Sequence, residues 1–150
     1  MKRIIVPIDF SPYSENAFYS AAKVASKGDA TITCLNVIQS DLDWNNLSTS
    51  EKIKNQEILD LEAEAKDKLK TFVATHKIKN TPVEALVEVG VPSQVLVDLA
   101  HKQKADLIVI GAYGKNREPG KFIGSTTQKV LRNAPCPVLA VQKIVDGRAM

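Results

Sequence analysis

The stretch KRIIVPIDFS, residues 2–11, indicates the fold of this chain because it joins a buried strand to the start of a helix. Residues 4–6 are three consecutive apolar residues, a pattern typical of a strand that helices cover on both faces. Ser11 and Pro12 then provide a capping residue and a first-turn proline, which are typical of a helix start. The stretch therefore predicts a strand over residues 2–8 that leads directly into a helix.

Alternation of strand and helix continues along the rest of the chain. Runs of apolar and β-branched residues predict strands over residues 2–8, 31–38, 83–89, 106–110 and 137–141. Between them, apolar residues recur at helical spacing, ending before Gly28 in the first helix. Ser48 and Glu51 have capping-box spacing and predict the start of the longest helix, which continues through Phe72. The segment around Val95 and residues 125–133, in which Val130 and Leu131 are expected to face inward, predict two more helices.

Such strict alternation predicts an α/β fold with one open, five-stranded parallel sheet and helices on both faces. With 150 residues, the chain has room for one compact domain. We assign residues 1–143 to this domain, and residues 144–150, which have no periodicity, to a short tail.

Composition and cysteine use argue against several classes of protein. The net charge of +3 comes from 20 basic and 17 acidic residues spread along the chain, so we expect neither nucleic acid nor a membrane surface as a partner. The apolar run near the N-terminus is too short for a signal peptide or a membrane span. Cys34 and Cys136 are far apart and form no metal-binding motif, which fits a reduced, cytoplasmic setting without a metal site built from cysteine.

The sequence GAYGKNREPGKFIGST, residues 111–126, follows the fourth predicted strand and contains neither common phosphate-loop motif. Its spacing is Gly111, Gly114 two residues later, and then nine residues before Gly124 and Ser125. Glycines let backbone amides approach a ligand, and a helix that starts at Ser125 favours an anion at its first turn. Basic residues, Lys115, Arg117 and Lys121, lie between the glycines. The residues themselves fit either a phosphate site or a long loop that Ser125 merely caps.

Asp9 lies at the end of the first strand, and in parallel sheets ligands bind beyond the carboxyl ends of the strands. If the first and fourth strands are neighbours, Asp9 faces the glycine-rich stretch across one crevice. A carboxylate before a helix can also simply favour the positive end of the helix dipole. We expect the ligand-binding role for Asp9.

The sequence resembles the universal stress protein family over nearly its whole length. The resemblance rests on KRIIVPIDFS, GVPSQVLVDLA, ADLIVIGAYG and GSTTQKVLRNAPCPVLAV, and on the G-x2-G-x9-G-[ST] spacing, which is the signature of the ATP-binding branch of the family. It implies strand order 3-2-1-4-5, a homodimer, and a nucleotide across the ends of the first and fourth strands. Carried over by position, it implies that Pro7, Asp9 and Val37 line the adenine and ribose, that Ile110 and Gly111 flank the sugar, and that Gly114, Gly124, Ser125 and Thr126 hold the phosphates.

The expected function is therefore that of an ATP-binding stress-response protein, a nucleotide-dependent binding or signalling module with Mg²⁺ accompanying the phosphates. An efficient hydrolase needs a residue that orients water, and the sequence offers no candidate besides Asp9, so any ATP hydrolysis is expected to be weak. We expect dimerisation through residues 137–141, an edge strand whose pairing with a twofold copy would satisfy both chains. The alternatives are a nucleotide-free dimeric scaffold of the same fold and a slow ATPase.

Overall fold

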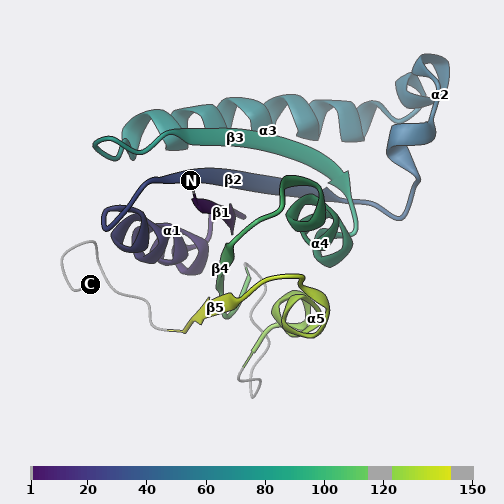
Figure 1. The fold of residues 1–150 in the computed structure, drawn as a ribbon. Helices are drawn as coiled ribbons and strands as arrows, with labels where there is room; N and C mark the ends of the chain where they lie inside the picture. Colours follow the sequence, from purple (N-terminus) through teal and green to yellow (C-terminus); the bar gives the residue numbers. More distant parts are fainter. Residues whose placement is uncertain (1, 115–122, 143–150) are drawn as a thin grey trace.

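The computed structural model describes residues 2–114 and 123–142, and Figure 1 shows their arrangement around one central sheet. The strands are β1 (Lys2–Pro7), β2 (Ala30–Gln39), β3 (Val83–Gly90), β4 (Leu107–Gly111) and β5 (Val138–Val141). Every pairing is parallel and the order is β3-β2-β1-β4-β5. The predicted α/β fold and strand order are confirmed.

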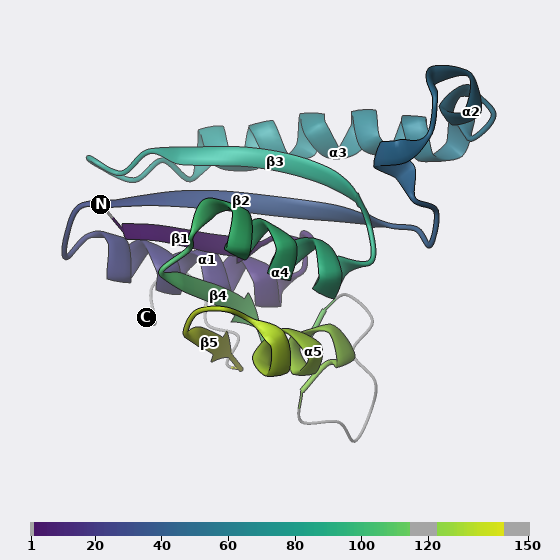
Figure 2. The ribbon, with the colours of Figure 1, turned by 45° about the vertical axis from the view of Figure 1, so that its right-hand side comes forward.

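Helices cover both faces of the sheet, as Figures 1 and 2 show. The helices are α1 (Pro12–Ala25), α2 (Thr49–Ile53), α3 (Gln56–Thr75), α4 (Pro92–Gln103) and α5 (Ser125–Asn133), with a 3₁₀ turn, η1 (Trp44–Asn46), before α2. One core cluster joins β1 and β2 to α1 and α3, with Phe18 and Leu69 fully buried in it. A second cluster joins the other face to α4 and α5, with Leu96 and Val130 fully buried.

The central strand explains why consecutive apolar residues predicted this fold. Ile4 and Val6 belong to the first cluster, whereas Ile5 belongs to the second, so neighbouring side chains on β1 are buried on opposite faces. Alternation of side chains along a strand makes this arrangement unavoidable. A strand with three apolar residues in a row must therefore lie in the middle layer.

Two expectations about helices are corrected. The Ser48–Glu51 capping box is present, but the helix it begins ends at Ile53, and α3 starts separately at Gln56. Asn55 separates them: its side-chain amide donates to the Glu51 carbonyl at 3.1 Å, in competition with a continuous helical hydrogen-bond pattern. In α5, Val130 is buried but Leu131 is 44% exposed, because adjacent residues on a helix point about 100° apart.

Some of the sequence predictions lie outside the described residues. These are the tail over residues 144–150 and the loop cations Lys115, Arg117 and Lys121. Within the part of the chain that the structure describes, no helix is both long enough and apolar enough to span a bilayer.

Candidate functional site

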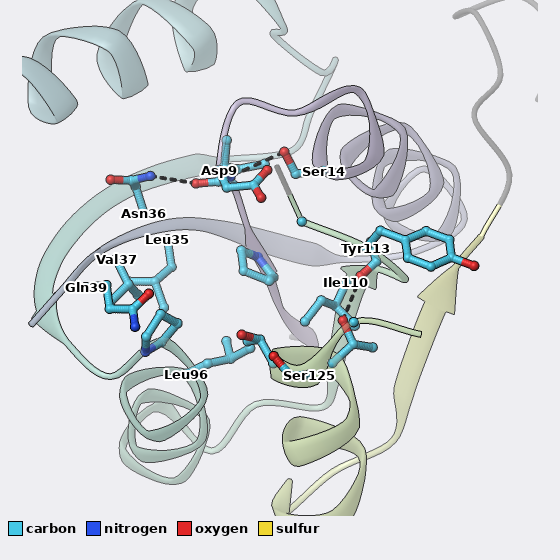
Figure 3. A pocket seen from close by; sticks show the side chains of 18 residues that line it. Asp9, Ser14, Leu35, Asn36, Val37, Gln39, Leu96, Ile110, Tyr113 and Ser125 are labelled. Atoms are coloured by element: carbon cyan, nitrogen blue, oxygen red, sulfur yellow. Dashed lines mark hydrogen bonds between the residues drawn. The ribbon is translucent and has the colours of Figure 1, made fainter. Parts of the chain in front are cut away.

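A pocket of about 380 Å³ lies where β1, β2 and β4 end, between α4 and α5 (Figure 3). Because β1 pairs with β4, the segments after these two strands lie side by side. The pocket is lined by all nine residues proposed from the sequence: Pro7, Asp9, Val37, Ile110, Gly111, Gly114, Gly124, Ser125 and Thr126. Its volume falls within the range of about 300–1,000 Å³ that is usual for small-molecule sites.

The two glycine-bearing segments are held together by backbone and side-chain hydrogen bonds. The Gly124 amide donates to the Ala112 carbonyl at 2.7 Å, and the buried Thr127 hydroxyl donates to the Gly111 carbonyl at 2.9 Å. These bonds place the first turn of α5 directly against the end of β4. The distant glycines of the sequence therefore become one wall of the pocket.

Gly124 is the N-cap of α5, and its backbone would accept other residues. Its φ of −67° and ψ of 157° are extended values, and a Cβ there would meet its nearest atom, the Ala112 carbonyl oxygen, at 3.4 Å. The helix has no side-chain cap. Since the first amides of a helix lack intrahelical acceptors and attract anions, this glycine leaves a donor-rich helix start open to the pocket.

Asp9 contributes both to the pocket wall and to the turn before α1. Its Oδ1 accepts a hydrogen bond from the Ser11 amide at 3.0 Å, across Phe10, whose φ of +65° is a left-handed conformation. Its Oδ2 lies 3.1 Å from where a Cβ on Gly114 would stand. The half-buried carboxylate therefore lies directly beside the glycine wall.

The opposite end of the pocket is mainly apolar. Leu35, Val37 and Leu96 line it, and Figure 3 shows Val37 and Gln39 on the side away from Tyr113 and Ser125. The Asn36 amide is already used, because it donates to the Ile8 carbonyl at 2.8 Å. The pocket thus has an apolar end suited to a flat ring and an amide-rich end suited to an anion.

Charge in the pocket is sparse. Among the described lining residues, Asp9 is the only Asp, Glu, Lys, Arg or His. The described residues also contain no group of three or more His, Cys, Asp or Glu side chains that could hold a metal ion. Any anion bound here would therefore meet backbone amides and hydroxyls on these residues, together with one carboxylate.

Sequence reasoning missed several lining residues, among them Asn36, Gln39, Pro92 and Tyr113. A signal existed for the first two, since polar residues at the end of a buried strand lie at the ligand-binding edge of a parallel sheet. Tyr113 gave no such signal. The residue is 9% exposed, and its ring packs edge-on against that of Tyr13, with ring centroids 5.3 Å apart.

Comparison with known proteins identifies relatives along the whole domain. Residues 1–142 match the universal stress protein family. A universal stress protein of Methanocaldococcus jannaschii is 31% identical, with 95% of this chain and 82% of the relative covered.

Solved structures of other proteins share the fold of this chain. Hypothetical protein MJ0577 shares the fold with a TM-score of 0.82 and 26% identity, over 97% of this chain and 98% of that one. A universal stress protein in complex with cAMP has a TM-score of 0.60 and 26% identity, over 94% of this chain and 96% of that one.

Proposed function

Because the chain belongs to the universal stress protein family, we propose that it binds ATP in the pocket at the ends of β1 and β4 and acts as a nucleotide-dependent signalling module in a stress response. The observation that carries the proposal is the open start of α5. Gly124 has no conformational need to be glycine, yet a Cβ there would lie 3.8 Å from the Gly114 amide nitrogen, one of the donors that a phosphate would reach. The related protein in complex with cAMP supports an adenine nucleotide as the ligand class.

The two ends of the pocket orient the nucleotide in this proposal. Adenine is flat and largely apolar, so it would lie against Val37, Leu35 and Leu96. The sugar would pass Pro7, Ile110 and Gly111, and the phosphates would meet the amides of Gly114 and Thr126 and the hydroxyl of Ser125. Gly124, whose amide already donates to Ala112, would leave room for their approach.

Asp9 leads us to include Mg²⁺. A carboxylate beside a polyphosphate repels it unless a cation lies between them, and Mg²⁺ is commonly bound by one or two carboxylates together with phosphate oxygens. Asp9 would hold the ion, directly or through water, and the phosphates would supply the other ligands. We therefore expect tighter ATP binding with Mg²⁺ than with EDTA.

The decisive test is calorimetric titration of the wild type and Gly124→Asp with ATP and Mg²⁺. The aspartate would occupy the phosphate approach and repel the anion, so we expect at least ~100-fold weaker binding, about 2.7 kcal/mol. Aspartate is a favourable N-cap, so the ligand-free variant should melt at or slightly above the wild-type temperature.

Gly28→Asp is the matched control, because Gly28 is exposed and has no atom within 4 Å of an added Cβ. It should bind ATP like the wild type. A wild type that gives no heat, or a Gly124→Asp variant of equal affinity, would favour the nucleotide-free scaffold instead.

We further propose that the chain forms a homodimer through residues 137–141. β5 is an edge strand, with one neighbour in the sheet, and Leu139 on it is 42% exposed. Pairing of two β5 strands would satisfy edge amides and carbonyls and cover this leucine. Light scattering should give a dimer mass at micromolar concentration, and Leu139→Lys should shift it toward the monomer.

We propose that the protein is cytoplasmic, because the cytosol keeps thiols such as Cys34 and Cys136 reduced. We also propose that the site binds ATP rather than hydrolysing it efficiently. Asp9 is the sole described lining residue that could accept a proton from water, and one of its oxygens already accepts from Ser11. We expect ATP hydrolysis, measured as phosphate release, to be slow on the time scale of nucleotide exchange.

A further inference from the structure

We propose that the side of the sheet at which the strands begin, opposite the pocket, is a docking surface for an acidic segment of a partner protein. All strands of a parallel sheet begin at the same side, and the connections from the preceding helices gather there, along the left of Figure 2. The exposed cations on this edge, which we call the basic edge, are Lys2, Arg3, Lys27, Lys77, Lys79, Lys102, Lys104 and Arg132. The exposed carboxylates near this edge are fewer: among the described residues, Asp29 and Asp106 lie in the connections and Glu84 lies near the start of β3.

This concentration of charge differs from the chain as a whole, whose net charge is only +3. The cations also lack partners: within the described residues, none of the basic-edge side chains forms an ion pair. Like charges gathered on one surface raise its potential and speed the arrival of an oppositely charged partner. The charge asymmetry therefore points to an anionic partner at this edge.

Helix ends explain only part of the basic edge. Lys102 and Arg132 lie in the last turns of α4 and α5, where cations compensate the negative end of the helix dipole. Lys104 is the C-cap of α4, and Lys27 and Lys77 directly follow the C-caps of α1 and α3, so the dipole favours these cations too. Lys2, Arg3 and Lys79 lie outside the helix ends, so the dipole does not account for them. Their clustering needs a different reason.

The surface is also hollowed. A depression within the basic edge is lined by Arg3, Lys102, Gln103, Lys104 and Asp106. Asp106 is engaged there with the backbone, because its Oδ2 accepts from the Arg3 amide at 2.7 Å. An extended acidic segment could therefore lie in this depression with cations on either side of it.

A protein segment fits this surface better than nucleic acid does. Proteins that bind single strands combine cations with exposed aromatic rings on which bases stack. No Phe, Tyr or Trp side chain in the described part of the chain is exposed, and His101 is the one exposed aromatic ring there. Glutamate and aspartate side chains need only the cations, which the basic edge supplies.

This location leaves the nucleotide pocket free, since the two lie at opposite edges of the sheet. A partner and a nucleotide could therefore be bound at the same time. The inference rests on charge and shape at the basic edge and does not depend on nucleotide binding.

The test is fluorescence anisotropy with a labelled peptide of ten glutamates, on the full chain at low salt. We compare the wild type with Lys102→Glu/Lys104→Glu and with the matched control Lys54→Glu/Lys66→Glu. Both variants change the charge equally, and all four lysines are exposed. We expect the first variant to weaken binding about tenfold or more and the control less than about twofold, with salt weakening the wild type.

Lys102→Glu removes a cation that compensates the α4 dipole, so a slightly lower melting temperature is expected. A wild-type circular dichroism spectrum and a cooperative melting transition would attribute the loss of peptide binding to the surface rather than to misfolding. The proposal fails if the peptide does not bind, or if both variants lose affinity equally, since net charge alone would then explain binding. It also fails if an oligouridine RNA or vesicles with anionic lipid bind the basic edge more tightly than the peptide.

Discussion

Gly111 offers the sharpest test of how α1 and β4 pack beside the pocket. A Cβ at Gly111 would lie 3.0 Å from the backbone carbonyl carbon and oxygen of Tyr13 and 3.1 Å from its Cβ. These atoms belong to the first turn of α1, which cannot move as a flexible side chain can. Gly111→Ala must therefore push helix and strand apart.

Overpacking of this kind costs about 1–3 kcal/mol of unfolding free energy. At about 2–4 °C per kcal/mol for a chain of this size, the melting temperature of Gly111→Ala should fall by about 2–12 °C. Gly28→Ala is the matched substitution: Gly28 has no atom within 4 Å of an added Cβ, and the alanine should change stability little or raise it by about 0.4–1 kcal/mol.

Urea unfolding followed by circular dichroism measures the unfolding free energy of both variants. If Gly111→Ala is as stable as Gly28→Ala, the close approach of α1 to β4 is not a constraint on the fold. The explanation of Gly111 as a packing glycine would then be wrong.

Two further predictions concern Asp9 and the thiols. Asp9→Ala should weaken ATP binding and lower the unfolding free energy by about 1 kcal/mol, because the Ser11 amide loses its acceptor. Asp9→Asn keeps an acceptor, so it should lose affinity for ATP without losing stability. Titration with ATP and urea unfolding measure the two effects. Burial raises the pKa of Cys34 to about 12 from the usual 9.0, so stability should fall as pH rises from about 9 toward 12, where only the unfolded chain releases the proton. Cys34→Ala should flatten this slope in alkaline urea titrations, and an unchanged slope would contradict the assignment.

The position of β1 in the sheet could be predicted because a few neighbouring residues are enough to indicate it. A strand buried on both faces has an uninterrupted apolar run, and such a run is typical of a central strand in a parallel sheet. The boundary between α2 and α3 could not be predicted in the same way. It depends on one side chain, Asn55, which forms a hydrogen bond that the apolar spacing does not record.

That the candidate site residues lie in one pocket was predictable, because all strands of a parallel sheet end at the same side. Asp9 and Gly124 are far apart in sequence, yet β1–β4 pairing brings their segments into one pocket. The hydrogen bond from the Ser11 amide to Asp9 could have been predicted, since aspartate commonly accepts from the amide two residues on. The left-handed conformation of Phe10 between them could not, because large residues other than glycine rarely adopt it.

The strand order also has a consequence for how the chain is made. Of the five strands, β1 is made first and can pair with β2 early, but its other neighbour begins only at Leu107. Until β4 is made, the central strand of the finished sheet is therefore an open edge with consecutive isoleucines. Exposed apolar edges of this kind promote aggregation, so the nascent chain is at its most vulnerable just before β4 emerges.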